Sequence, residues 1–112
     1  MEKAKRAVKN GNPKDAARWA KKALDFKPGS LEANLVLGLA YTDSGTPGSA
    51  RQAYQAVLAK EPNNCDANFG VAKADDDEQK TEDARKKYLH FIEICPKDRD
   101  VAFAQDRASK LE

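Results

Sequence analysis

The chain has 112 residues and a formal net charge of +2, and 40% of its residues are hydrophobic. This length favours one domain with one modest core, and the composition excludes a disordered chain. The small net charge gives no global field for nucleic acid or membranes, and no apolar run reaches the roughly 20 residues of a membrane span. The sequence therefore predicts no nucleic-acid partner and no membrane insertion.

Charge is distributed unevenly along the chain. Residues 1–30 contain nine Lys or Arg and three Asp or Glu. Residues 65–112 contain nine Lys or Arg and twelve Asp or Glu. Solvated helix faces are the favoured explanation. The alternative is self-association, in which the basic start of one copy docks on the acidic end of another.

A proline recurs every 34 residues, at Pro28, Pro62 and Pro96. A fixed period of 20–50 residues is typical of proteins built from stacked structural repeats. Small and aromatic residues keep the same step: Ala16, Ala50 and Ala84, and also Ala20, Tyr54 and Tyr88.

The first period, residues 1–29, contains the turn "NGNPKD", in which Asn12 can cap a second helix. It begins about four residues late relative to the period. We therefore expect a degenerate or truncated first repeat, and further repeats before Met1 are an open alternative.

The second period, residues 30–63, predicts a helix over Leu31–Asp43 after a cap at Ser30, and a second helix over Ala50–Lys60. Gly45 can end the first helix, and Thr46 can cap the second with a proline at its first position. The buried stripe of the first helix is expected at spacings of three and four residues: Asn34, Leu37, Gly38 and Tyr41.

The third period, residues 64–97, has Asn64 as its expected cap, and Asp98 is the expected cap of a final helix within residues 98–112. The acidic run 75–78 lacks the spacing and the glycine of a calcium loop. We expect it to be a solvated helix end.

This pattern of helix, tight turn and helix resembles the tetratricopeptide repeat, and the second period carries the likeness best: Asn34, Leu37-Gly38, Tyr41, Ala50, Tyr54 and Pro62. The resemblance implies an all-α fold, a right-handed superhelical stack of antiparallel helix pairs. It also implies repeats at residues 1–29, 30–63 and 64–97, with a capping helix at 98–112.

The resemblance further implies a non-catalytic scaffold that binds a peptide or helix segment of another protein in a concave groove. The first helices of the repeats would line this groove, on the stripe one residue beyond the buried one. The expected groove residues are Lys5, Leu35, Leu39, Thr42, Phe69, Lys73 and Asp76, with Asp66 beside them. Packing between adjacent first helices is the alternative role of Leu35 and Phe69.

Some modules of this family clamp the acidic C-termini of heat-shock chaperones with Lys, Asn and Arg on their first helices. Only Lys5 suits that task among the residues at the matching positions, which are Met1, Lys5, Val36, Asp66 and Gly70. The chaperone-binding function is therefore not expected here.

The two cysteines, Cys65 and Cys95, stand at the two ends of the third helix pair, which an antiparallel arrangement brings together. Free thiols in a cytoplasmic protein are the favoured interpretation, and a disulfide, which would indicate an extracytoplasmic location, is the alternative. His90, the one histidine, is expected to face solvent. Because the chain has no CxxC pair, phosphate loop or Ser–His–Asp set, we predict no metal site, no cofactor and no catalysis.

Overall fold

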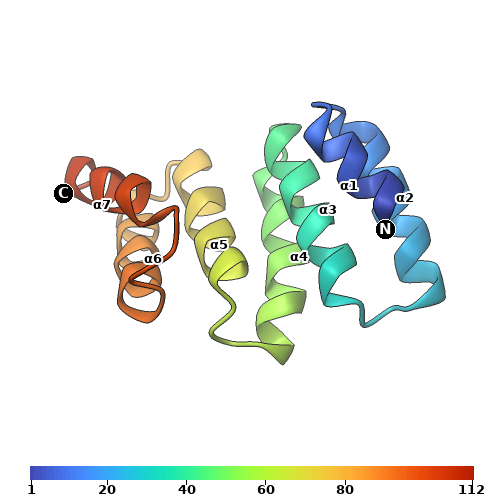
Figure 1. Ribbon diagram of the computed structural model, residues 1–112. Coiled ribbons are helices and arrows are strands. Elements are labelled where there is room, and N and C mark those ends of the chain that lie inside the picture. Colours follow the sequence, from blue (N-terminus) through green and yellow to red (C-terminus); the bar gives the residue numbers. More distant parts are fainter.

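The computed structural model describes all 112 residues and contains seven helices in an elongated row of 41 × 25 × 22 Å. The two termini lie at opposite ends of this row (Figure 1). None of the helices has the length and apolar character that crossing a lipid bilayer requires. The helices are α1 (Glu2–Lys9), α2 (Pro13–Phe26), α3 (Leu31–Asp43), α4 (Pro47–Lys60), α5 (Cys65–Asp77), α6 (Thr81–Ile94) and α7 (Val101–Lys110).

The helices form three consecutive pairs, α1–α2, α3–α4 and α5–α6, and α7 packs on α6 at the C-terminal end (Figure 1). Each pair contacts the next, α2 against α3 and α4 against α5. Because α3 also contacts both α1 and α5, these three helices make one layer, and α2, α4 and α6 make the other. The predicted all-α stack of helix pairs is confirmed.

Polar side chains begin three of the helices as the sequence predicts. The side chains of Asn12, Ser30 and Asn64 each accept a hydrogen bond from the amide N–H three residues later, at 3.3, 3.1 and 2.9 Å. These bonds satisfy amide groups that the first turn of a helix leaves free. Thr46 holds the cap position of α4 but makes no such bond.

The predicted cap at Asp98 is wrong. The last helix begins at Val101, and the Asp98 carboxylate instead accepts a hydrogen bond from the N–H of Asp100, at 2.9 Å. The side chain therefore closes a turn in the segment before α7. This segment becomes part of the candidate site described below.

The turns inside the three helix pairs share one backbone conformation. Gly11 and Gly45 have φ angles of +71° and +73°, and Gln79 at the same place in the third pair has a φ of +62°. A glycine adopts this left-handed conformation without steric cost, whereas a residue with a Cβ does not. The third turn thus keeps the geometry of the other two although its glycine is missing.

Small residues let the helices approach closely, and one aromatic ring uses that space. Ala16, Ala50 and Ala84 have no exposed surface at all. The ring of Tyr54, on α4, lies across Gly38 of α3 and Gly70 of α5, and a Cβ at Gly38 would stand only 2.6 Å from it. The two glycines therefore allow Tyr54 to reach the opposite layer, where it forms the back of the candidate site.

The end of α5 differs from the expected solvated helix end. Only 2% of the Asp75 side chain is exposed, and it pairs with Arg51 of α4, at 2.8 Å, and with Lys87 of α6. Arg51 also pairs with Glu78. Cations from both neighbouring helices neutralise the negative charge of Asp75, so the carboxylate can be buried. It therefore links α5 to α4 and α6.

Candidate functional site

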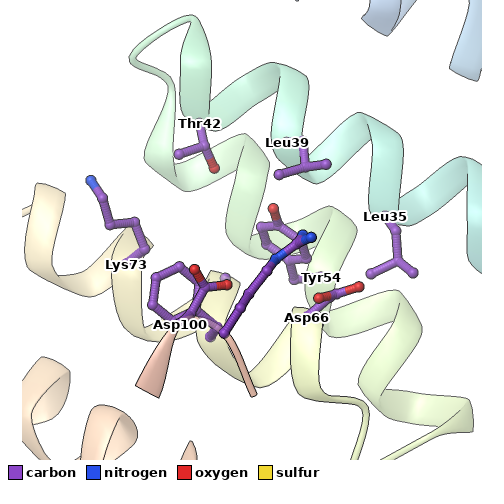
Figure 2. A pocket seen from close by; sticks show the side chains of 10 residues that line it. Leu35, Leu39, Thr42, Tyr54, Asp66, Lys73 and Asp100 are labelled. Atoms are coloured by element: carbon purple, nitrogen blue, oxygen red, sulfur yellow. The ribbon is translucent and has the colours of Figure 1, made fainter. Parts of the chain in front are cut away.

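A pocket of about 300 Å³ opens between α3, α5 and the segment before α7. Figure 2 shows the side chains of α3 on one side of it and those of α5 and the segment before α7 on the other. This volume is at the lower end of the range typical of ligand pockets. The lining residues are Leu35, Leu39 and Thr42 from α3, Tyr54 from α4, Asp66, Phe69, Gly70 and Lys73 from α5, and Arg99 and Asp100 from the segment before α7.

The apolar part of the pocket consists mainly of Leu35, Leu39 and Phe69. Leu39 is 46% exposed, whereas Leu35 and Phe69 are half-buried. The Phe69 ring also packs on the rings of Phe91 and Phe103, at centroid distances of 5.3 and 5.7 Å. Phe69 therefore supports the core and the pocket together, whereas Leu39 presents an apolar surface that the protein leaves in water.

Tyr54 brings a polar group to the back of the pocket. Burial raises the pKa of Tyr54 to about 12. The phenol is consequently protonated at neutral pH and can donate a hydrogen bond. The Thr42 hydroxyl donates to the carbonyl oxygen of Gly38, at 2.9 Å, so its lone pairs remain able to accept.

Four charged side chains, two of each sign, line the pocket. Lys73 pairs with Asp77, at 2.6 Å, whereas Asp66, Arg99 and Asp100 form no ion pair. Burial raises the pKa of Asp100 above its usual range, and the negative charges of Asp98 and Asp66 raise it further while Arg99 opposes them. The pocket edge therefore combines an apolar wall with charges that are not all compensated.

Five of the seven predicted groove residues line this pocket: Leu35, Leu39, Thr42, Phe69 and Lys73. Lys5 does not line it, and its ammonium group pairs with Glu32 of α3, at 2.7 Å. That pair lies between α1 and α3, toward the N-terminal end of the same layer.

Asp76 also lies outside the pocket and faces α7. It accepts hydrogen bonds from the Arg107 guanidinium at 2.7 and 2.8 Å and from the Tyr88 hydroxyl at 2.8 Å. The bonds from Arg107 are the main cause that lowers the pKa of Asp76, against the effect of burial. The helical count placed Asp76 on the groove stripe because it could not include the position of α7, whose arginine draws this carboxylate away.

Four lining residues were not predicted as groove residues: Tyr54, Gly70, Arg99 and Asp100. Tyr54 belongs to α4, in the other layer, and it reaches the pocket only because Gly38 and Gly70 leave room for its ring. Arg99 and Asp100 belong to an irregular segment, where no helical periodicity indicates a direction. Only Gly70 carried a signal, since a glycine in a helix suggests a close approach of another group.

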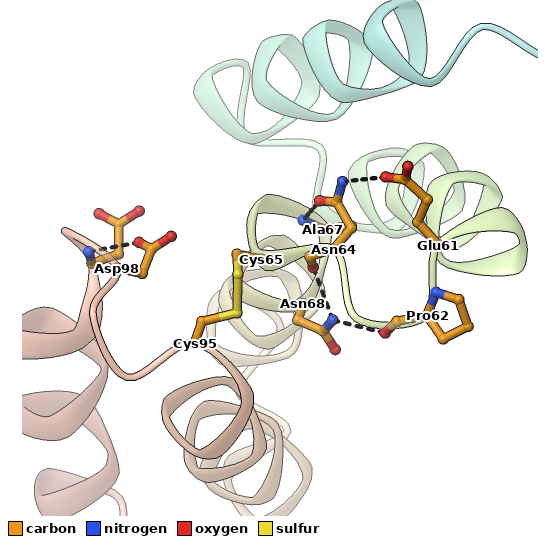
Figure 3. Close-up of a disulfide and its surroundings, with 9 residues drawn as sticks. Glu61, Pro62, Asn64, Cys65, Ala67, Asn68, Cys95 and Asp98 are labelled. Carbon is orange, nitrogen blue, oxygen red and sulfur yellow. Dashed lines mark hydrogen bonds between the residues drawn. A yellow bond between two sulfur atoms is a disulfide. The ribbon is translucent and has the colours of Figure 1, made fainter.

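A disulfide fixes two walls of the pocket to each other. Cys65, the first residue of α5, is bonded to Cys95, which directly follows α6, and their Cα atoms are 6.0 Å apart (Figure 3). The favoured interpretation of the sequence, two free thiols, is therefore wrong, and the alternative, a disulfide, is the one observed. Asp66 is adjacent to one cysteine, and the segment with Arg99 and Asp100 begins at the other. The bond therefore holds both carboxylates near the same end of α5.

Comparison with known proteins supports the fold. A family model described as "Tetratricopeptide repeat" matches residues 1–64 and 35–99. No curated protein matches the chain in sequence.

Several solved structures share the fold at low sequence identity. The "Arabidopsis OM64 TPR domain" superimposes with a TM-score of 0.90 at 15% identity, over 99% of this chain and 89% of that one. The "First TPR of Spaghetti (RPAP3) bound to HSP90 peptide SRMEEVD" gives 0.88 at 22% identity, over 98% and 85%. The second TPR domain of human RPAP3, in complex with the HSP70 peptide SGPTIEEVD, gives 0.85 at 13% identity, over 98% and 89%. These likenesses confirm the predicted superhelical stack.

Proposed function

Because the chain belongs to the tetratricopeptide repeat family, whose domains are in general non-catalytic interaction modules, we propose that it is a scaffold that binds a segment of another protein in the pocket between α3 and α5. The observation that carries this proposal is Leu39, a large apolar side chain that is 46% exposed at a pocket. Leu35 and Phe69 extend its apolar surface. A partner side chain that covers this surface removes it from water, which favours binding.

The polar groups around the apolar wall suit an extended peptide or a short amphipathic helix. Such a segment has backbone N–H and C=O groups that need partners once water is excluded. The Tyr54 hydroxyl can donate and the Thr42 hydroxyl can accept at the back of the pocket. An apolar anchor with nearby hydrogen-bonding groups is the usual composition of a peptide site.

The two RPAP3 domains bind acidic chaperone peptides, SRMEEVD and SGPTIEEVD. We expect neither peptide to bind this chain saturably, because Asp66 stands at a clamp position and Lys5 is paired with Glu32. Fluorescence anisotropy with labelled forms of both peptides measures this directly. A low-micromolar affinity that weakens with salt would contradict the expectation.

The test of the proposed function is an affinity capture from the source cell's lysate with three baits. These are the unmodified chain, Leu39→Asp and Leu89→Asp. Leu89, on α6, is also 46% exposed but does not line the pocket, so the third bait is a matched control. Phe69 is left unchanged because its ring packs on Phe91 in the core.

We expect a partner that the unmodified chain and Leu89→Asp retain and Leu39→Asp loses. Circular dichroism of all three baits establishes that each is folded. If every protein captured is common to the three baits, binding does not use the pocket and the proposal fails.

Self-association is a second candidate, supported by the exposed aromatic residues at opposite ends of the row. Phe26, at the end of α2, is 92% exposed, and Phe103, on α7, is 42% exposed. The charges of these two ends are opposite in sign, as the sequence shows. Sedimentation velocity at low and high salt tests this candidate, because association through opposite charges weakens as salt is added.

A further inference from the structure

The cations of the pocket are less available to a ligand than its carboxylates. Two cations line it, and the Lys73 ammonium already lies 2.6 Å from Asp77. Its charge is thus compensated within the protein. Arg99 is the one lining cation without an ion pair.

The lining carboxylates, Asp66 and Asp100, have no cationic partner. Neither forms an ion pair, and Figure 2 shows both turned toward the pocket. A third carboxylate, that of Asp98, accepts a hydrogen bond from the N–H of Asp100 and therefore lies beside this residue. The lining therefore holds two unpaired carboxylates and one unpaired cation, Arg99, and the charge of Asp98 beside Asp100 adds to the negative potential. A ligand cation placed at this edge would relieve the repulsion among the carboxylates.

The apolar wall and this acidic edge belong to one pocket, so that one short segment can contact both. An apolar side chain of the segment would cover Leu39 and Phe69. A neighbouring side chain of the same bound segment would then lie near Asp66 and Asp100. A carboxylate at that place would add a fourth negative charge, and such a like-charge contact selects against a partner.

We propose that the groove selects a basic apolar segment, one in which Lys or Arg stands beside a large apolar residue. The apolar side chain lies on Leu39 and Phe69, and the cation lies at Asp66 and Asp100. This inference rests on the proposed function, since it specifies the chemistry of the segment that the same pocket binds.

The test is a selection of random octapeptides displayed on phage against the immobilised, oxidised protein. The same library is selected on Leu39→Asp. Peptides that depend on the pocket are those enriched on the unmodified protein and not on Leu39→Asp. Among them we expect Lys and Arg to be enriched, and Asp and Glu depleted, relative to the starting library.

Anisotropy of the enriched peptides then identifies which carboxylates are responsible. The variant Asp66→Asn/Asp100→Asn should weaken their binding at least about fivefold, and more at low salt. The control variant Asp25→Asn/Asp83→Asn removes two exposed carboxylates that do not line the pocket, so it should leave the affinity unchanged.

The outcomes separate the two proposals. Pocket-dependent peptides without a basic bias, or with an acidic one, overturn the inference and leave the proposed function in place. An equal loss in both carboxylate variants also overturns it, because the attraction is then a property of the whole surface. If no enriched peptide depends on Leu39, the proposed function itself fails.

Discussion

Reduction of the Cys65–Cys95 disulfide should destabilise the protein without unfolding it at room temperature. The two cysteines are 30 residues apart in sequence. In the chain-entropy account, a closed loop of about 30 residues restricts the unfolded chain enough to stabilise the folded state by about 3.6 kcal/mol. The fold persists after reduction, because the ion pairs of Asp75 and Asp76, at the other end of α5, still join this helix to α4, α6 and α7.

The size of the effect on the melting temperature follows from the chain length. Unfolding entropy is about 2.1 cal/mol/K per residue near 60 °C, so a loss of about 3.6 kcal/mol over this chain lowers Tm by about 15 °C. Circular dichroism at 222 nm during heating, with and without a phosphine reductant, measures the difference. Urea unfolding under the same two conditions gives the free energy of unfolding.

The control is the variant Cys65→Ala/Cys95→Ala. Alanine is chosen because Cys95 is only 5% exposed and a serine hydroxyl there would lack a partner. The reductant should not change the Tm of this variant. Mass spectrometry verifies that both thiols of the wild-type protein are fully reduced. The reasoning is refuted if the free energy of unfolding of this reduced form lies within about 1 kcal/mol of that of the oxidised form.

Two further predictions concern the turn and the ion pair at the C-terminal end of α5. Gln79→Gly should raise the free energy of unfolding by about 0.5–1 kcal/mol, because glycine relieves the left-handed strain but adds entropy to the unfolded chain; a Tm equal to or below that of wild type would show that no strain is stored there. Arg107→Gln should lower the free energy of unfolding at pH 7, and the difference in this free energy between the variant and wild type should become smaller in acid. The sign follows from the lowered pKa of Asp76: the stabilisation is present above the unfolded carboxyl pKa of about 3.9 and is lost as the pH falls through the folded value. Urea unfolding between pH 7 and pH 2 measures this difference, and a difference that does not change with pH would mean that the arginine acts through packing alone.

Much of the fold could be predicted because its signals are local. The predicted helix over Leu31–Asp43 has those bounds in the structure, and the caps at Asn12, Ser30 and Asn64 accept the predicted type of hydrogen bond. Helical spacing, caps and turn residues involve residues within about four positions of one another, so these signals can be recognised in the sequence alone. The 34-residue period then indicates how the pairs stack, because neighbours with the same surface pack in the same way.

The candidate site was predictable in part for the same reason. Leu35, Leu39 and Phe69 lie on one helical stripe, and the structure brings them to one pocket. Asp76 lies on that stripe as well, yet Arg107 of α7 turns it away. A helical count describes one helix at a time and contains no information on a side chain that arrives from 31 residues away.

The sequence by itself determined the helices, their pairing and the apolar stripe that lines the pocket. The tertiary structure decided which charges meet: it buries Asp75 with Arg51 and Lys87, and it leaves Asp66 and Asp100 unpaired at the pocket. It also closes the Cys65–Cys95 bond, which joins two walls of that pocket. The physical reason is that hydrophobic periodicity and backbone hydrogen bonds are properties of neighbouring residues. The environment of a charge or a thiol depends on every element packed around it.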